Sequence, residues 1–503
     1  MIARDAREVA EVVGGSVLPG AAPAGGPEGR DEHALRGIAV VDSRAVGAGD
    51  LFVAVPGTRV DGHDFVAAAV GSGAGAALVE HDVPGGQALA APLVRVDDTV
   101  AALTGLARWS HARGREAGTR TVGITGSAGK TTTKDLLAAV LRRLVPGAEE
   151  PAGERLVVAT PGSYNNELGL PLTVLRADAT TRLLVVEMGA RGTGHVAHLC
   201  GIARPDVAVV LGVGSAHLSE FGSREAIAQA KGELVEALDG DDPAALAVLN
   251  GDDALVRAMA GRTRAPVLLV GTGSGCGVRA DDVDLDADAR LRFTLVDARG
   301  TSERRAPVRL ALTGEQHLGN ALAAAAVALH VTGADVAAVA DALTGARPAS
   351  RYRMEVVDRP DGVRVINDAY NASPEAVAAA LRALAHVGRA AEPRRRTWAV
   401  LGEMLELGEH AREAHDRVGR LAVRLNVDRL VAVGDGALHV HTGAAHEGSW
   451  GEESVHVPDI DAARALLAAE LAPGDVVLVK ASNSVGLWRL GEELARAGQG
   501  VGA

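Results

Sequence analysis

A glycine-rich turn between a strand and a helix, within residues 121–144, constrains the fold of this chain more than any other segment. A β-branched run ends at Thr125, the turn reads Gly126-Ser127-Ala128-Gly129-Lys130-Thr131-Thr132, and an apolar-periodic helix follows. Glycines allow a tight turn that directs backbone N–H groups inward, and the helix N-terminus adds partial positive charge. Lys130 would reach the terminal phosphates of a nucleotide, and the Thr131 hydroxyl would hold Mg²⁺. The turn therefore predicts an ATP-binding loop.

The spacing of its glycines departs from the common phosphate-loop pattern. The position six before Lys130 is Ile124, and the glycines stand at 123, 126 and 129. The alternative interpretation is a glycine-rich strand–helix turn that binds nothing. The Lys-Thr pair placed directly before the helix favours ATP binding.

The composition indicates a large protein and excludes several function classes. A length of 503 residues suggests about three domains. The formal charge of −13 without a basic stripe argues against a nucleic-acid partner. Two cysteines, Cys200 and Cys276, cannot form a disulfide framework. With no signal peptide or membrane-spanning run, we expect a cytoplasmic protein without a membrane partner, and a monomer.

Three α/β regions follow one another, with expected bounds of 1–97, 98–347 and 348–503. In the second, apolar strands at 183–187 and 207–211 each precede a helical pattern, which predicts βαβ units and a mainly parallel P-loop-type sheet. The third repeats this alternation as a Rossmann-like unit, with strands at 363–366, 398–401, 430–433 and 476–479. The fold class is therefore α/β with three domains, the first of them small.

Three polar residues of the second region are candidates for chemistry. Glu187 ends an apolar strand, where ligands bind in open α/β sheets, and could hold Mg²⁺; the alternative is a solvated carboxylate. His217 follows the next strand and could bind a metal, although a lone histidine is as often structural. Lys231 lies in an amphipathic helical pattern, and spacing alone predicts a solvated lysine.

The ordered motifs of the chain resemble those of the Mur ligases, ATP-dependent amide ligases that build the peptide of bacterial cell-wall precursors. The resemblance covers essentially the whole length, and the offset glycines of the phosphate loop are the spacing that this family uses. Its further marks are Gly162-Ser163-Tyr164-Asn165-Asn166-Glu167, Glu187-Met188-Gly189-Ala190, Ala216-His217-Leu218, Ala230-Lys231-Gly232-Glu233 and Gly314-Glu315-Gln316-His317 through Asn320.

Two stretches resemble the family type that adds D-Ala-D-Ala to UDP-MurNAc-tripeptide. One is Asp42-Ser43-Arg44 with Asp61-Gly62-His63, and the other is Asn367-Asp368-Ala369-Tyr370-Asn371. The resemblance implies that the first region binds the UDP-linked substrate and that ATP activates a carboxylate as an acyl phosphate. It also implies substrate contacts at Ser43, Arg44, Asp61, His63, Asn165, Tyr370 and Asn371.

The resemblance further implies roles around the nucleotide. Catalysis would depend on Lys130, Lys231, His217, Glu187 and Asn166. Two Mg²⁺ ions would be held by Thr131, Glu187, His217 and Lys231, the last as a carbamate. Asn320 would contact adenine, unless it is the N-cap of the helix that follows. Arg351 and Asp368 would contact phosphate and ribose.

The chain departs from the family pattern at two places. Gly212 stands where asparagine is usual, and Lys480-Ala481-Ser482-Asn483 replaces Lys-Gly-Ser-Arg, so a carboxylate grip by arginine is missing at Asn483. Two alternatives stay open. One is another Mur-type or folylpolyglutamate-type ligase, and the other is an ATP-binding regulator without catalysis. The sequence leaves the third residue of the peptide open, as lysine or a diaminopimelate isomer.

Overall fold

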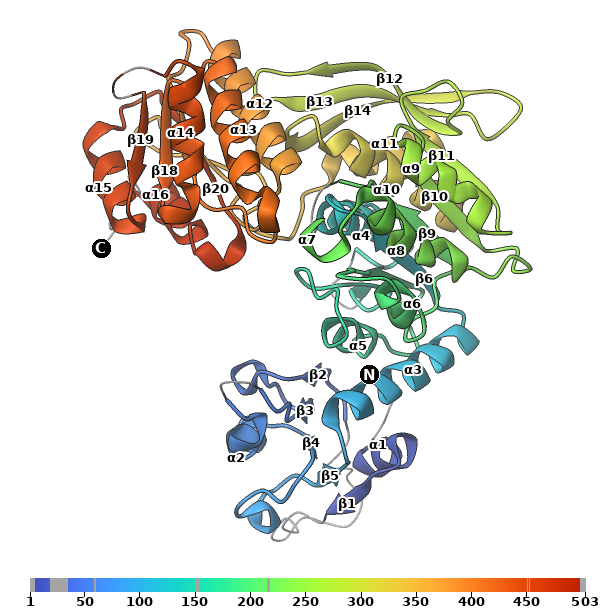
Figure 1. Cartoon of the computed structure of the whole chain (residues 1–503). Coiled ribbons are helices and arrows are strands. Elements are labelled where there is room, and N and C mark those ends of the chain that lie inside the picture. Colours follow the sequence, from blue (N-terminus) through green and yellow to red (C-terminus); the bar gives the residue numbers. More distant parts are fainter. Residues whose placement is uncertain are drawn as a thin grey trace.

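The protein folds into three successive α/β units, each built on its own sheet (Figure 1). The computed structural model describes residues 5–18, 35–57, 60–149, 153–214, 218–449, 451 and 453–497. Within these residues the sheets span 16–95, 120–313 and 355–480, inside the three predicted regions. The predicted fold class, α/β with three domains, is confirmed. None of the helices in the described ranges has the length and apolarity needed to cross a membrane.

The N-terminal domain is a small sheet with strand order β1-β5-β4-β3-β2. Strands β2 to β5 run parallel, and β1 pairs antiparallel with β5. The strands are β1 Ser16–Leu18, β2 Ala39–Val40, β3 Leu51–Val53, β4 Ala76–Val79 and β5 Leu93–Arg95, with helices α1 Ala6–Val13 and α2 Val66–Gly71. Because β2, β3 and β4 are parallel, the loops that follow them meet at one edge of the sheet.

Helix α3 (Thr99–Glu116) joins this domain to the central one (Figure 1). The Asp98 carboxylate caps it by accepting hydrogen bonds from the backbone N–H groups of Val100 and Ala101, both at 2.8 Å. Its buried face includes Leu103 and Leu106, which lie in one apolar cluster with residues of α1 and of α5 (Gly169–Val174). The helix therefore fastens the two domains through apolar packing.

The central domain has the strand order β14-β13-β12-β11-β10-β9-β6-β8-β7. The strands are β6 Arg120–Thr125, β7 Val157–Ala159, β8 Leu183–Glu187, β9 Val207–Val210, β10 Leu246–Asn250, β11 Val267–Gly271, β12 Val278–Leu285, β13 Arg290–Asp297 and β14 Arg304–Thr313. In the order of the sheet, every neighbouring pair from β7 through β8, β6, β9, β10 and β11 to β12 is parallel, as predicted. Strands β12, β13 and β14 form an antiparallel ribbon that the sequence patterns did not predict.

Helices cover the central sheet and place its loops. They are α4 Lys130–Leu144, α6 His195–Cys200, α7 Leu218–Phe221, α8 Arg224–Glu236, α9 Ala254–Arg257, α10 His317–Thr332 and α11 Val336–Gly345, in addition to α5. Helix α10 is almost entirely buried and packs against α4. It begins at His317, so Asn320 lies inside the helix, and the interpretation of Asn320 as the N-cap is wrong.

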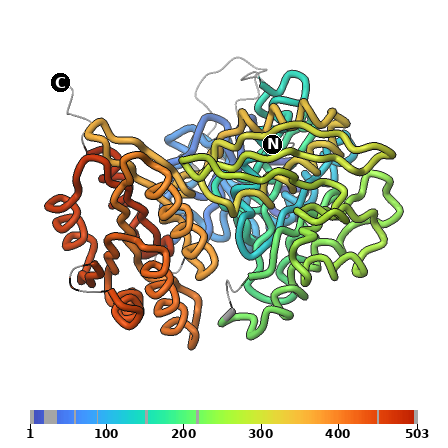
Figure 2. The backbone as a smooth tube through the Cα atoms, turned by 90° about the horizontal axis from the view of Figure 1, so that it is seen from above, coloured from blue at the N-terminus to red at the C-terminus, as the bar shows by residue number. Residues whose placement is uncertain are grey.

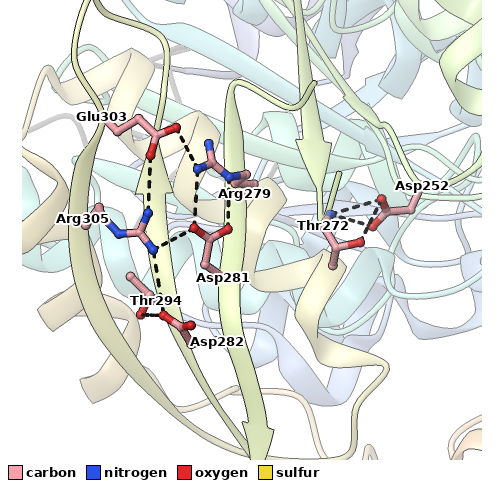
Figure 3. Close-up of polar contacts among 8 residues, drawn as sticks. All are labelled: Asp252, Thr272, Arg279, Asp281, Asp282, Thr294, Glu303 and Arg305. Atoms are coloured by element: carbon pink, nitrogen blue, oxygen red, sulfur yellow. Dashed lines mark hydrogen bonds and ion pairs between the residues drawn. The ribbon is translucent and has the colours of Figure 1, made fainter. Parts of the chain in front are cut away.

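One face of the antiparallel ribbon carries a network of paired charges (Figure 3). The Arg279 guanidinium lies 3.0 Å from Asp281 and 2.7 Å from Glu303, and that of Arg305 lies 2.7 Å from Asp281. Thr294 adds a hydroxyl hydrogen bond to Asp282 at 3.0 Å. Arg279 and Arg305 therefore each have at least two carboxylate neighbours.

The C-terminal domain has the strand order β15-β16-β20-β17-β18-β19, parallel except for β15. The strands are β15 Glu355–Asp358, β16 Arg364–Asn367, β17 Thr397–Leu401, β18 Arg429–Val433, β19 Ser454–Val457 and β20 Val476–Lys480. The helices are α12 Pro374–Ala390, α13 Ala411–Arg424, α14 Leu438–Glu447, α15 Ile460–Glu470 and α16 Trp488–Arg496. Separate apolar clusters fill the two faces of the sheet, as in a doubly wound fold.

Candidate active site

A cleft of about 1100 Å³ separates the central and C-terminal domains, which lie side by side in Figure 2. The phosphate loop and the first turn of α4 line one wall, and the loop that follows β16 lines the opposite wall. Hydrogen bonds join the domains around the cleft, from Ser350 N–H to Asp135 at 2.9 Å and from the Ser219 hydroxyl to the Glu406 carbonyl at 2.9 Å. The cleft is therefore enclosed by two domains that touch at its margins.

The phosphate loop has the backbone geometry that its glycines predict. Gly126 and Gly129 have φ values of 157° and 83°, in the region that favours glycine. A Cβ on Gly129 would lie 2.3 Å from the Asn320 side-chain oxygen, so a larger residue would clash there. The loop therefore needs glycine at 129 both for its turn and for the approach of α10.

Lys130 is the first residue of α4, directly after Gly129 of the loop, and is half-buried. Its Nζ donates to the Gly126 carbonyl at 2.7 Å. Burial lowers the pKa of the Lys130 amine, and the nearby Arg353 lowers it further, while Glu187 opposes both. A phosphate placed at the loop would supply the counter-charge that this lysine otherwise draws from one carboxylate.

Glu187 ends β8, fully buried at the floor of the site. Its Oε2 accepts from the Thr131 hydroxyl at 3.2 Å and from the Asn165 amide at 3.4 Å. Its Oε1 is buried and has no hydrogen-bond partner among the described residues. Burial raises the pKa of Glu187, against the opposing charges of Lys134, Lys130 and Arg353. The alternative interpretation of Glu187 as a solvated carboxylate is therefore wrong.

Lys231 reaches the same cleft from α8 and is 3% exposed. The solvated lysine predicted from spacing is wrong, because this face of α8 packs into the domain core. Its amine donates no hydrogen bond to any residue that the structure describes. Burial, and then the charge of Lys130, lower the pKa of Lys231 to about 7. A substantial fraction of this amine is therefore neutral near pH 7.

These groups fit the Mg²⁺ expected from the sequence. The Thr131 hydroxyl and the free Glu187 oxygen are hard oxygen ligands, and a buried carboxylate oxygen without a partner is the atom that a divalent cation would satisfy. Lys231 would add an oxygen ligand only as a carbamate. His217, the remaining expected ligand, lies outside the described residues.

The loop at residues 162–169 forms the next part of the wall. Asn165 contacts Glu187, as above, and Asn166 accepts the Gly169 N–H at 2.8 Å, which positions the start of α5. Both asparagines line the cleft. The Ser163 hydroxyl is hydrogen-bonded to the Tyr370 hydroxyl of the C-terminal domain, so this loop is also a point of contact between the domains.

The C-terminal wall is held in place by Lys480. Its Nζ lies 2.6 Å from the Asp368 carboxylate and donates to the Asn371 carbonyl at 2.8 Å. Asp368 also accepts the Met354 N–H at 3.0 Å. These bonds fix the loop that carries Asp368, Tyr370 and Asn371, all of which line the cleft together with Asn483.

Arg353, which the sequence reasoning missed, lies in the cleft, whereas Arg351 is not among its lining residues. Arg351 pairs with Glu492 at 2.7 Å, while Arg353 stacks over the Tyr370 ring at 4.2 Å. Tyr352 and Met354 have φ values of 61° and 53°, in the left-handed region, and the backbone bends here. The pattern Arg-Tyr-Arg gives no signal that could have separated the two arginines.

Further cleft residues carry charge or a buried ring that the sequence did not single out. Arg191, His195 and His198 come from α6 and the turn before it, and His317 from the start of α10. Burial lowers the pKa of His317 to about 4, and its Nδ1 lies 3.3 Å from the Asn320 amide nitrogen. Gly212 also lines the cleft, and its carbonyl accepts the Ser127 N–H at 2.9 Å.

The residues expected at the uridine end lie in the N-terminal domain, at the carboxyl edge of β2 and β3. Ser43 and Arg44 follow β2, and Arg44 is exposed and paired with Asp42 at 2.7 Å. Asp61 and His63 follow β3, with His63 Nδ1 at 2.6 Å from Asp61. Ser43, Arg44, Asp61 and His63 do not line the cleft.

Asp61, His63 and His81 come close enough together to suggest a metal site, but hydrogen bonding opposes it. His63 Nε2 accepts the backbone N–H of Glu80 at 2.8 Å, so the proton of a neutral ring must be on Nδ1, where it is donated to Asp61. Both ring nitrogens are engaged, and we interpret the cluster as a positioned histidine.

Comparison with known proteins agrees with this architecture. Three family models match in order: the Mur ligase family catalytic domain over residues 38–111, the Mur ligase middle domain over 124–328, and the Mur ligase glutamate ligase domain over 352–483. The UDP-N-acetylmuramoyl-tripeptide–D-alanyl-D-alanine ligase of Mycobacterium tuberculosis is 47% identical, with 98% of each chain covered. The ligase of the same name from Bacillus subtilis is 32% identical over 98% of this chain and 99% of its own.

Solved structures give the same result. MurF from Acinetobacter baumannii superposes with a TM-score of 0.79 at 27% identity, covering 98% of this chain and 99% of its own. MurF ligase from Thermotoga maritima, solved in complex with ADP, has a TM-score of 0.72 at 31% identity over 94% and 99%. Since the family models span all three domains and the relatives match from end to end, the chain belongs to the Mur ligase family.

Proposed function

We propose that the protein uses ATP to join D-Ala-D-Ala to UDP-MurNAc-tripeptide, giving UDP-MurNAc-pentapeptide, ADP and phosphate. The observation that carries the proposal is the cleft itself. It brings the phosphate loop and the buried amine of Lys231 into one site between two domains, and Thr131 and Asn165 of its lining hydrogen-bond to the buried Glu187. Full-length relatives that carry the name of this ligase support the choice of substrates.

The chemistry requires that the tripeptide carboxylate be activated before the amine attacks it. The carboxylate oxygen attacks the γ-phosphorus of ATP, the bond from that phosphorus to the bridging oxygen breaks, and ADP leaves. The nitrogen of D-Ala-D-Ala then attacks the acyl carbon, phosphate departs with the bonding electrons, and the amine loses a proton. Because most of the catalytic benefit of such a transfer comes from positioning and charge neutralisation, a closed cleft with fixed cations suits it.

We assign ATP to the phosphate loop. The backbone from Gly126 to Thr132 would cradle the phosphates, and Lys130 would exchange its bond to the Gly126 carbonyl for the terminal phosphates. Arg353, stacked on Tyr370, would bring a second cation from the C-terminal wall, the role expected of Arg351 from the sequence. Asn320, one side chain away from Gly129, would contact adenine, and Asp368 would contact ribose after release by Lys480.

We place Mg²⁺ at Thr131 and Glu187, with Lys231 as a further ligand after carbamylation. The pKa of Lys231, lowered to about 7 by burial, supplies the neutral amine that reaction with CO₂ requires. The ions would neutralise the phosphate and carboxylate oxygens that must approach each other. His217 would complete the set.

The tripeptide end would lie between Asn165, Asn166, Tyr370 and Asn371, and the uridine end near Ser43, Arg44, Asp61 and His63. Arg191, His195 and His198 lie in the same cleft and could contact peptide carboxylates in place of the arginine that Asn483 replaces. Since ATP and the nucleotide-linked precursor are both cytoplasmic metabolites, we propose that the reaction occurs in the cytoplasm.

Phosphate release is the direct test. We expect release with ATP and UDP-MurNAc-tripeptide to depend on D-Ala-D-Ala, and mass spectrometry to show the pentapeptide product. Release that responds to a single amino acid or to glutamate, but not to D-Ala-D-Ala, would indicate another Mur-type or folylpolyglutamate-type ligase. ATP binding without release under any of these conditions would favour the regulator and reject the proposed function.

A further inference from the structure

A second cavity, of about 320 Å³, lies at the other end of the antiparallel ribbon, beside the C-terminal end of α11. Among the described residues, it shares no lining residue with the cleft between the domains. Its charged lining is four arginines and one carboxylate, namely Arg290, Arg292, Arg309, Arg347 and Asp286. The chain as a whole has a formal charge of −13, whereas these five side chains together carry a formal charge of +3, four arginines less one carboxylate.

Two of these arginines face each other across the sheet. Arg292 of β13 and Arg309 of β14 are direct partners in the antiparallel register. Like charges placed directly opposite each other destabilise a strand pair. Asp284 of β12 stands opposite Arg292 on its other side, without an ion pair between them, and an anion between the two guanidinium groups would remove the repulsion that remains.

The same three strands pair their arginines more closely at their other end, whereas in the cavity Arg290 and Arg292 each lie 3.6 Å from one carboxylate, of Asp288 and Asp286. At the other end, Arg279 and Arg305 lie among Asp281, Asp282 and Glu303, at distances from 2.7 to 3.8 Å (Figure 3). At that end of the ribbon, neighbouring carboxylates neutralise the charges of Arg279 and Arg305. In the cavity, the side chains of Arg309 and Arg347 have no carboxylate partner among the described residues.

The single carboxylate of the cavity is already engaged. Asp286 accepts the backbone N–H groups of Asp288 and Arg290 at 3.0 and 2.9 Å, and Arg292 approaches it only to 3.6 Å. The Arg290 Nε–H is buried and has no acceptor among the described residues. Arg347 is held by the Thr344 and Ala346 carbonyls, at 3.4 and 3.1 Å, without neutralisation of its charge.

We propose that this arginine cavity binds a small phosphate-class oxyanion, either inorganic phosphate or the diphosphate of a nucleotide. Guanidinium groups match the tetrahedral oxygens of phosphate with paired N–H donors, and the buried Nε–H of Arg290 lacks an acceptor among the described residues. The volume is at the low end for ligand pockets, which favours a compact anion over a whole cofactor.

Equilibrium dialysis with radiolabelled inorganic phosphate tests the proposal. The full-length protein is first saturated with ADP and Mg²⁺, so that the phosphate loop is occupied. We expect the wild type to bind one further equivalent of phosphate, and the double variant Arg292→Gln/Arg309→Gln to bind it at least about tenfold more weakly, since two charge-assisted contacts are lost. The matched control is Arg279→Gln/Arg305→Gln, which removes two paired arginines from the same ribbon and should bind phosphate like the wild type.

Two further measurements keep the result interpretable. Phosphate should raise the melting temperature of the wild type but not that of the R292Q/R309Q protein, at matched ionic strength in chloride. If that variant fails to fold, Arg347→Gln at the exposed end of α11 replaces it.

Displacement of phosphate by UDP would assign the site to nucleotide diphosphates, whereas binding of phosphate alone would assign it to the free ion. Binding of neither, or equal binding by the cavity variant, overturns the proposal.

Discussion

The two junctions of the central domain differ in what fills them. The junction with the N-terminal domain is apolar, with one buried cluster that includes Val9 of α1, Leu103 and Leu106 of α3, and Leu170 of α5. The junction with the C-terminal domain is polar and hollow, with the cleft at its centre and hydrogen bonds such as that from Arg382 to Glu315, at 2.6 Å, at its margins.

We infer from this difference that the apolar junction holds its two domains in one arrangement, whereas the polar junction can open. Apolar burial is favourable over its whole area, and its loss exposes that area to water. A polar contact contributes little net free energy, because water can replace either partner when the domains part. Substrates must enter the cleft and products must leave it, so the chemistry lies at the junction that is easier to open.

The largest effect should come from removing chemistry from the hollow junction. We expect Lys231→Ala to lower turnover by about 10²–10³-fold, the loss typical when one preorganised electrostatic group is removed. The melting temperature should not fall, because the buried amine has no hydrogen-bonding partner among the described residues. Steady-state phosphate release and calorimetry measure the two quantities. Partial recovery with added short carboxylates would support a lost carbamate, and wild-type turnover would show that Lys231 is not a ligand.

The apolar junction should respond in the opposite way. Leu106→Ala should lower the free energy of unfolding by about 2–5 kcal/mol, since it leaves a cavity in the cluster beneath α3. Turnover well below the melting temperature should stay near that of the wild type. Leu438→Ala is the matched control, because Leu438 is 42% exposed and its loss should cost under about 0.5 kcal/mol. A fall in turnover without loss of stability would contradict the division between the junctions.

How much of each junction could be predicted from the sequence depends on how far apart along the chain its interacting residues are. The phosphate loop and Glu187 are local: a strand, a turn and a helix lie together in sequence, and a strand end fixes where its last side chain lies. These features were predicted from the sequence because neighbours along the chain determine them.

The cleft is formed by residues far apart in sequence, and for these residues the sequence patterns gave a wrong prediction or none. The burial of Lys231 depends on what packs over α8, so an amphipathic pattern predicted solvent instead. Arg351 and Arg353 flank Tyr352, a non-glycine residue with left-handed backbone, which the sequence does not mark. Ser163 and Tyr370 meet although 207 residues separate them. The antiparallel ribbon was missed because its strands carry charged residues at many positions.

Buried cationic groups with lowered pKa values lie on both sides of the comparison, and pH can separate His111 from Lys231. Burial, with a smaller effect of Arg115, lowers the pKa of His111 on α3 to about 4, and burial lowers that of Lys231 to about 7. Both folded-state values lie below the unfolded ones, so the native protein binds fewer protons and loses stability as pH falls through each window. For His111 the pH range between the unfolded and folded pKa values is 6.5 to 4, and for Lys231 it is 10.5 to 7. Within each range the free energy of unfolding changes by up to about 1.4 kcal/mol per pH unit for each group.

Urea unfolding across pH, without metal or nucleotide, measures these slopes. His111→Gln should reduce the slope in the acidic window alone, where the buried His317 still contributes, and Lys231→Met should reduce it in the alkaline window alone. If both variants flattened the same window, the two groups would not titrate independently.

The smallest effect should come from a single polar bond across the cleft. Tyr370→Phe removes the hydroxyl that meets Ser163 but keeps the ring under Arg353, so the free energy of unfolding should fall by no more than about 0.5–1.5 kcal/mol. If the bond acts in closure, kcat/KM should fall as well, and Ser163→Ala should add little to the loss. Tyr352→Phe is the control, because its hydroxyl bonds Glu492 at 2.6 Å within the C-terminal domain and should show no coupling to Ser163. Strict additivity of Y370F and S163A in kcat/KM would instead mean that the hollow junction closes without this bond, and that its other marginal contacts hold the domains together.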